Sequence, residues 1–117
     1  LKRKKTKRMT ISTEKAKTIL DKTLDITMIE LSDEQKNDLV TQLSEQSISA
    51  KTRDEKIEEV ATLIEIIENY VEEKDITVDN PERMEAVMYE GIPPEETSAF
   101  YGTWYFDIED MMIEELY

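Results

Sequence analysis

The sequence predicts an all-α fold, a small bundle of about five to six helices around one long central helix at residues 52–74. Only two Gly and three Pro residues interrupt its 117 residues. Its apolar residues recur at the three- and four-residue spacing of amphipathic helices, and helix-capping residues precede several of these runs. No stretch forms a convincing strand. We therefore expect a flexible basic tail at residues 1–10 and a single acidic helical domain at residues 11–117.

The first two helices are predicted by residues that can cap them. Ser12 or Thr13 can accept hydrogen bonds from the free amides of a first turn. Apolar residues follow at helical spacing, namely Ala16, Ile19, Leu20 and Leu24. Residues 26–31 either extend this helix or form an apolar turn. A second helix begins at Ser32, because Ser32 and Gln35 have the spacing of a capping box.

The central helix has the clearest apolar pattern. One stripe, spaced by three and four residues, contains Ile57, Val60, Ile64, Ile67 and Val71. A second stripe beside it contains Leu63, Ile66 and Tyr70. A helix with so broad an apolar side touches neighbours on two sides, in a monomer or across a homodimer. Its outer side carries an acidic ridge, either a solvated helix surface or a secondary binding surface, made of Glu58, Glu65 and Glu72.

A short helix is predicted after residue 80. Asn80 can cap it, and Pro81 suits its first turn because proline needs no amide hydrogen there. Its apolar residues are Met84, Val87 and Met88. Gly91 ends this helix, since glycine readily adopts the conformation that follows a helix end.

Two more helices are predicted near the C-terminal end. Pro94 can open a short helix that Gly102 closes. Asp107 can cap a final helix, while residues 103–106 could be extended. The apolar residues of the final helix are Ile108, Met111, Met112 and Leu116.

The charge is distributed unevenly along the chain. The net charge is −13, composed of +7 over residues 1–22, −3 over residues 23–53 and −17 over residues 54–117. Such asymmetry opposes folding through self-repulsion and therefore indicates an electrostatic partner.

The composition excludes several kinds of chemistry. The chain has no Cys and no His, so it lacks disulfides, thiolate nucleophiles, Cys-bound zinc and the usual general base. Its two glycines form no phosphate-binding loop. We expect no enzyme activity, no cofactor and no metal, although carboxylates alone could in principle hold magnesium. No apolar run is long enough to span a membrane, and the basic start lacks the apolar stretch of a signal peptide. We expect a cytoplasmic protein.

Residues 84–117 combine acids with aromatic rings. They contain no Lys or Arg, nine acidic residues and seven of the eight aromatic residues. Carboxylates one helical turn apart, about 5.4 Å, can imitate the phosphates that basic grooves recognise. The predicted partner-binding face comprises Glu95, Glu96, Asp107, Glu109, Asp110, Glu114, Glu115, Tyr101 and Tyr105. Three further aromatic residues are predicted to lie in the core, Phe100, Trp104 and Phe106, while Tyr117 suits core or surface.

Residues 100–116, FYGTWYFDIEDMMIEEL, resemble a segment of ArdA-type antirestriction proteins. That family has an aromatic residue, a glycine, another aromatic residue and then an acidic helix with an Asp–aromatic step and paired Glu. The corresponding residues here are Tyr101, Gly102, Trp104, Asp110, Glu114 and Glu115. The alignment needs a one-residue insertion, and Met111 replaces the aromatic residue after Asp110. The resemblance implies a DNA mimic that blocks a DNA-binding enzyme in defence against mobile elements.

The leading hypothesis is a small acidic inhibitor, of phage or mobile-element origin, that blocks the basic groove of a DNA- or RNA-binding enzyme such as a nuclease or polymerase. This hypothesis would place the protein among anti-defence inhibitors, of the antirestriction or anti-CRISPR kind. One alternative is a nucleic-acid-binding or assembly component that uses its basic tail, with possible contacts through Lys2, Arg3, Lys4, Lys5, Lys7 and Arg8. Another alternative is an antitoxin-like acidic subunit of a larger complex.

Overall fold

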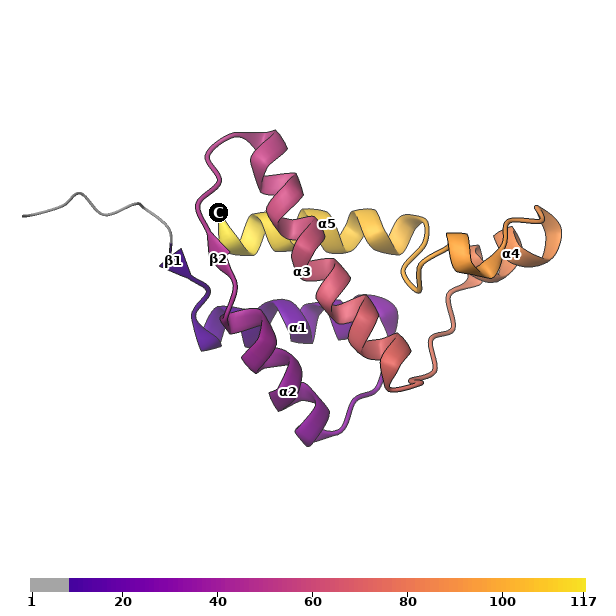
Figure 1. Ribbon diagram of the computed structural model, residues 1–117, viewed down its shortest axis with the longest axis horizontal. Helices are drawn as coiled ribbons and strands as arrows, with labels where there is room; N and C mark the ends of the chain where they lie inside the picture. Colours follow the sequence, from indigo (N-terminus) through magenta and orange to yellow (C-terminus); the bar gives the residue numbers. More distant parts are fainter. Residues whose placement is uncertain (1–8) are drawn as a thin grey trace, which may run out of the picture.

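The computed structural model describes residues 9–117, and the predicted all-α bundle is confirmed there (Figure 1). Five α-helices and one turn of 3-10 helix make up most of the structure. They are α1 (Thr13–Thr27), α2 (Asp33–Ser44), α3 (Arg53–Glu73), α4 (Pro81–Tyr89), η1 (Pro94–Glu96) and α5 (Thr103–Leu116).

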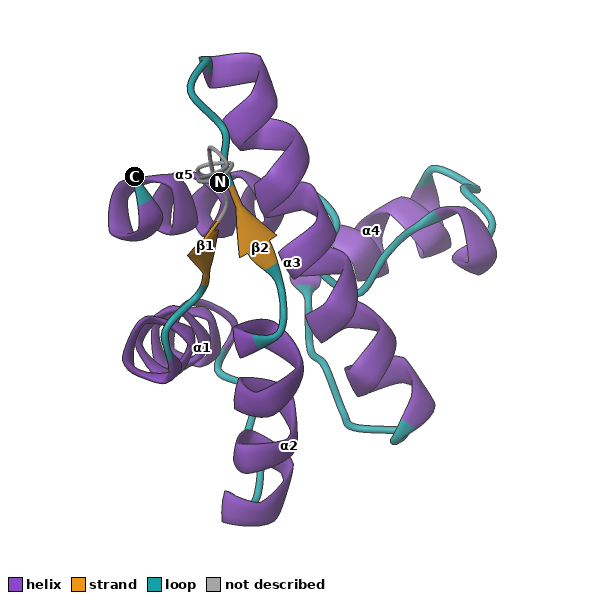
Figure 2. Ribbon diagram, turned by 60° about the vertical axis from the view of Figure 1, so that its left-hand side comes forward, coloured by secondary structure: helices purple, strands orange, loops and turns teal. Residues whose placement is uncertain are grey.

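Two short strands precede the first and third helices (Figure 2). β1 (Met9–Thr10) pairs with β2 (Ser47–Ile48) in antiparallel register. Ile11, the first residue of the predicted helical domain, follows β1 and is only 3% exposed. The sequence did not predict these strands, because two paired residues are too few to show the alternation of apolar and polar side chains that marks a strand.

The long helix α3 is central, as predicted. It packs against α2 and α5, and it crosses α5 in Figure 1. The helix α1 packs against the same two helices. The two apolar stripes of α3 supply much of the core through Val60, Leu63, Ile64, Ile67, Tyr70 and Val71. Two residues of these stripes, Ile57 and Ile66, are only half-buried.

The predicted caps of the first helices are confirmed. The Ser12 hydroxyl accepts from the Lys15 amide at 3.1 Å, and Ser32 forms the expected capping box with Gln35. Met28 adopts a left-handed conformation with φ of 58° and ends α1. Residues 26–31 therefore include the end of α1 and a turn rather than a longer helix.

The predicted boundaries near the C-terminal end are wrong. Pro94 opens only the three-residue η1, and α5 begins at Thr103 rather than at Asp107. Residues 103–106 are therefore helical and not extended. The reason is a cap from another helix, because the carboxylate of Glu82 in α4 accepts from the Thr103 amide at 3.2 Å.

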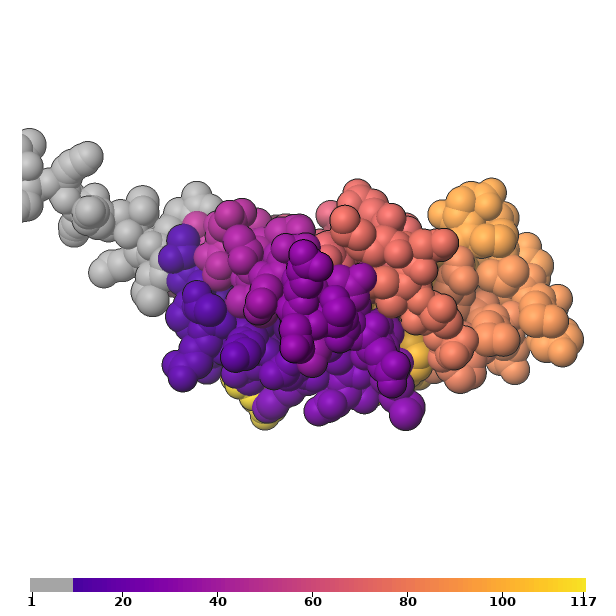
Figure 3. All heavy atoms as spheres, turned by 90° about the horizontal axis from the view of Figure 1, so that it is seen from below, coloured from indigo at the N-terminus to yellow at the C-terminus, as the bar shows by residue number. Residues whose placement is uncertain are grey.

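Residues 81–96, the α4–η1 arm, form the end of the molecule opposite β1 (Figures 1 and 3). Ala86 is the one buried residue of α4. Met84, Met88 and Tyr89 are 52%, 66% and 79% exposed, so the predicted apolar side of this helix largely faces solvent. Polar contacts of Asn80 and Glu82, described below, hold the arm to the bundle.

Truncation of the α3 core should destabilise the whole bundle. Ile67 is fully buried, and Ile67→Ala should lower the free energy of unfolding by about 2–5 kcal/mol through lost burial and a cavity. The exposed neighbour Asn69 provides the control, since Asn69→Ala should stay within about 0.5 kcal/mol. Urea unfolding followed by circular dichroism measures both. Equal losses would contradict the central position of α3.

Candidate partner-binding surface

The part of the chain that the structure describes is strongly acidic. Residues 1–8 hold six of the 15 basic residues and none of the 28 acidic ones, which leaves a formal charge of −19 from Met9 onward. Between residues 9 and 117 the only ion pair joins Lys22 Nζ to Glu115 Oε2 at 2.5 Å. Most carboxylates therefore lack a cation of the same folded domain as partner.

Three of the predicted acids form one exposed row on α5. Asp107, Asp110 and Glu114 are exposed and follow each other at spacings of three and four residues, which places them on one side of the helix. Opposite them, Ile108 and Met112 are fully buried. We call these three carboxylates the outer acid row. They are held by a helix whose other side is fixed in the core.

Glu115 lies on the side of α5 that faces α1. Besides its ion pair with Lys22, its backbone oxygen accepts from Lys15 Nζ at 2.7 Å. The hydrogen bond and charge of Lys22 hold the pKa of Glu115 below its ordinary value. Glu115 thus joins two helices of this chain and does not lie in the outer acid row.

Glu109 lies on the flank of α5 near α3. Burial raises the pKa of Tyr105, and the negative charges of Glu109, Glu68 and Glu65 raise it further. The charges of acids from both α3 and α5 therefore act on the Tyr105 hydroxyl. The acidic ridge predicted on α3 is exposed at each of its members, Glu58, Glu65 and Glu72. Helical spacing places Glu109 away from the outer acid row.

The other predicted acids lie on the α4–η1 arm. Glu95 and Glu96 belong to η1 and are exposed. Figure 1 shows η1 beside α4, beyond the start of α5. The nine predicted residues thus fall into several regions instead of one continuous face.

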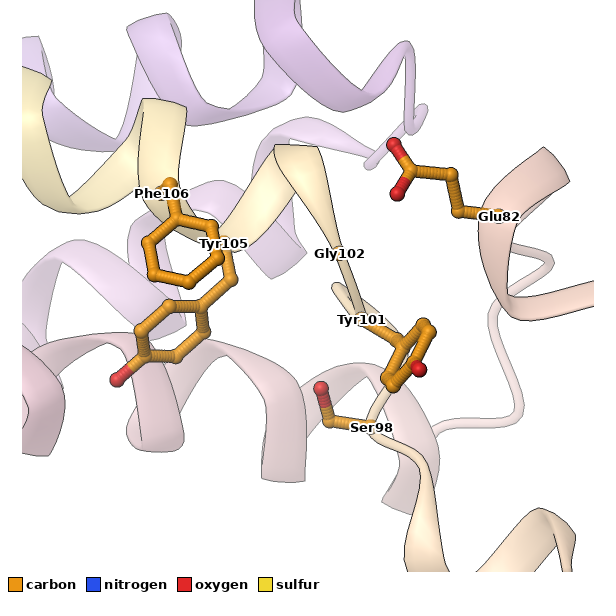
Figure 4. Close-up of a pocket in the computed structure, with 6 residues that line it drawn as sticks. All are labelled: Glu82, Ser98, Tyr101, Gly102, Tyr105 and Phe106. Carbon is orange, nitrogen blue, oxygen red and sulfur yellow. The ribbon is translucent and has the colours of Figure 1, made fainter. Parts of the chain in front are cut away.

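An aromatic pocket opens where the arm meets α5 (Figure 4). Its volume is about 400 Å³, and its lining residues are Glu82, Ser98, Tyr101, Gly102, Tyr105 and Phe106. Tyr101 and Tyr105, both predicted to contact a partner, are half-buried here. The pocket joins residues of α4, the loop before α5 and the first turns of α5.

Phe106 was predicted to lie in the core but is 63% exposed. Its ring meets Tyr105 edge to face, with ring centroids 6.0 Å apart. Because α5 begins at Thr103, the helical register turns Phe106 away from the buried side that Ile108 and Met112 occupy. Phe100 is fully buried and Trp104 packs against the core, so the prediction is confirmed for these two. Tyr117 is 38% exposed and its hydroxyl donates to Glu59.

Asn80 and Glu82 fix the loop that forms the pocket wall. Asn80 Nδ2 donates to the backbone oxygens of Ala99 at 3.0 Å and Tyr101 at 2.8 Å, while its Oδ1 caps α4. Glu82 caps α5 through the Thr103 amide. Asn80 at the start of α4 and Glu82 in the first turn of α4 therefore tie the loop to the arm.

Gly102 is required by the same geometry. Its φ is +90°, a conformation that residues with a side chain rarely adopt, and an added Cβ would lie 2.8 Å from Glu82 Cδ. Glycine therefore lets the carboxylate of Glu82 approach the start of α5.

Glu68 on α3 binds the backbone of the loop before α5. It is only 9% exposed, and its carboxylate accepts from the Phe100 amide at 3.4 Å. Burial raises the pKa of Glu68, hydrogen bonds from Ser98 and Phe100 oppose this shift, and the charges of Glu72 and Glu65 add to it. Its role depends on a loop 32 residues away in the sequence.

Sequence reasoning missed Glu82, Ser98 and Gly102 as parts of one site. Their contacts join residues up to 21 positions apart, and a pattern of neighbouring residues in the sequence cannot predict contacts over that separation. The six basic side chains predicted to contact nucleic acid, Lys2, Arg3, Lys4, Lys5, Lys7 and Arg8, lie outside the described residues.

Two further properties concern residues 9–117 alone. None of their helices combines the length and apolar character needed to cross a bilayer. No group of three or more acidic side chains there is placed to hold a metal ion.

Comparison of the chain with protein-family models, with curated proteins and with solved structures found no match.

Replacing Gly102 should destabilise the fold more than replacing Gly91. Gly91→Ala meets no atom within 4 Å and should cost about 1–2 kcal/mol from its positive φ alone. Gly102→Ala should lower the free energy of unfolding by more for two reasons. Its φ of 90° and ψ of −140° suit a residue with a side chain poorly, and Glu82 must also move and release the Thr103 amide. Chemical denaturation measures both variants, and equal losses would contradict this account of Gly102.

Replacing Glu68 should change how stability depends on pH. Its pKa is raised in the folded protein, so the folded state binds more protons and stability falls as pH rises from the ordinary value of 4.5 through the raised value. Glu68→Gln keeps an acceptor for the Phe100 amide and removes the titrating group, so the variant does not lose this stability as pH rises. We expect the variant to gain stability relative to the parent protein as pH rises from 4 to 7, measured by thermal unfolding. A pH-independent difference would refute the assignment.

Proposed function

We propose that this protein acts by binding, as an acidic mimic of nucleic acid that occupies the basic groove of a DNA- or RNA-binding protein. The observation that supports this most is the outer acid row of Asp107, Asp110 and Glu114. These carboxylates are exposed, follow each other at one-turn spacing and have no cationic partner between residues 9 and 117.

The rigidity of α5 makes this row suitable for recognition. Its opposite side is buried against α1 and α3, so the carboxylates are positioned before a partner arrives. Binding then orders few additional groups, which lowers the entropy that association must overcome. Replacing the counterions of a basic groove by fixed carboxylates uses the same electrostatic attraction that holds nucleic acid there.

The net charge of the described residues supports fast association. A formal charge of −19 attracts a basic surface over a distance set by the ionic strength. The partner class that fits is a nuclease, a polymerase or a related nucleic-acid-binding enzyme. The resemblance of residues 100–116 to antirestriction proteins favours a defence nuclease, with inhibition by steric and electrostatic competition and no chemical step.

A matched pair of triple variants tests this function. Asp107→Asn/Asp110→Asn/Glu114→Gln removes the outer acid row. Neutralising Asp25, Glu30 and Glu45, which are exposed on other elements, changes the net charge equally. Each protein is immobilised and used to capture proteins from a host lysate. We expect the parent protein and the second variant to retain a nucleic-acid-binding protein, and the outer-row variant to lose at least about tenfold in affinity, or 1.4 kcal/mol.

Competition by nucleic acid distinguishes the alternatives. Duplex DNA or RNA should displace the captured protein, and rising salt should weaken its retention. A captured basic protein that nucleic acid does not displace would favour an antitoxin-like subunit. Retention of nucleic acid alone, lost on removal of residues 1–8, would favour a binding role for the basic tail. Equal capture by the two triple variants would refute the assignment to the outer acid row.

A further inference from the structure

We infer that the aromatic pocket at the start of α5 binds the guanidinium group of an arginine side chain supplied by the protein partner. This inference rests on the proposed function, because it names a specific contact with a basic partner. It concerns a different surface from the outer acid row and can be tested without the partner.

The pocket walls suit a planar cation. Tyr101, Tyr105 and Phe106 contribute three rings to a space of about 400 Å³. Phe106 is 63% exposed, and its ring lies nearly perpendicular to that of Tyr105 at a centroid distance of 6.0 Å, so much of the Phe106 ring is available to a ligand. Aromatic faces attract cations, and arginine stacks on them more readily than lysine because its charged group is flat and weakly hydrated.

The polar groups of the pocket match the hydrogen bonds of arginine. Each oxygen of Glu82 accepts one long contact from the Thr103 amide at 3.2 Å, and a carboxylate has further lone pairs for the two parallel N–H groups of a guanidinium. The Ser98 hydroxyl points into the same space in Figure 4 and can accept another. Aromatic rings and one carboxylate together favour arginine over a neutral side chain.

The surrounding charge selects for a cation as well. No Lys or Arg lines the pocket. Three further carboxylates, those of Glu65, Glu68 and Glu109, act on the Tyr105 side chain from α3 and α5. An anionic ligand would meet repulsion from each of them, whereas a cation would relieve their mutual repulsion.

Peptide titration monitored by NMR tests the inference on the full chain. The probes are the blocked tripeptide Gly-Arg-Gly and its citrulline analogue, which has nearly the same shape but no charge. We expect the arginine peptide to shift the amide signals of Tyr101, Tyr105 and Phe106 with saturation at millimolar concentration, and the citrulline peptide to bind about tenfold more weakly.

Two exposed apolar residues provide matched variants. Phe106→Ala should weaken arginine binding at least about threefold, while Met88→Ala, a residue 66% exposed on α4 and outside the pocket lining, should leave it unchanged. The outer-row triple variant should also retain pocket shifts, which separates this site from the proposed function.

Three outcomes would overturn the inference. One is equal binding of the arginine and citrulline peptides. Another is equal or tighter binding of a Gly-Lys-Gly peptide, since a guanidinium site prefers the planar group. The third is a set of shifts confined to the outer acid row. If the pocket binds arginine but no nucleic-acid-binding protein is captured, the pocket assignment stands and the proposed function fails.

Discussion

The hydrogen bonds that hold residues 97–103 are the contacts on which the arm and the start of α5 depend. The loop turns the chain from the α4–η1 arm into α5, the helix that completes the bundle. Its backbone groups form hydrogen bonds with three side chains, those of Glu68 on α3, Asn80 before α4 and Glu82 within α4. The loop conformation is therefore set by groups distant in sequence, and the start of α5 and the pocket wall follow from it.

Electrostatic repulsion is the main opposing constraint. A bundle with a charge of −19 over its described residues must gain its stability from burial. The fully buried residues of α3, with Ile19, Leu39 and Phe100 around them, provide this. Several carboxylates form contacts within the protein. Glu55 forms a capping box with Thr52, Glu115 forms an ion pair with Lys22, and Glu82 binds the first amide of α5. The remaining carboxylates weaken the fold slightly while they stay available to a partner.

The sequence was sufficient for those features that depend on near neighbours. The caps at Ser12, Ser32 and Asn80 involve residues two or three positions apart, and the apolar stripes of α3 show its central place directly. The sequence was insufficient where a residue distant along the chain determines the start of a helix. Asp107 was a plausible local cap, but the cap residue is Gly102, five positions earlier, where Glu82 binds the Thr103 amide. The added turn directs Phe106 toward solvent. Glu109 and Glu115 lie away from the outer acid row because of helical periodicity alone, which a start at Asp107 would share.

The packing of α1 against α5 has a consequence for how the chain folds. The contact of Lys15 with Glu115 spans 100 residues, and Ile108 and Met112 of α5 complete the core. During synthesis, α1 therefore leaves the ribosome long before α5, one of the two helices that it packs against, exists. The part of the core that α5 covers can close only after α5 has been made. Removal of α5 would expose apolar surface on both α1 and α3.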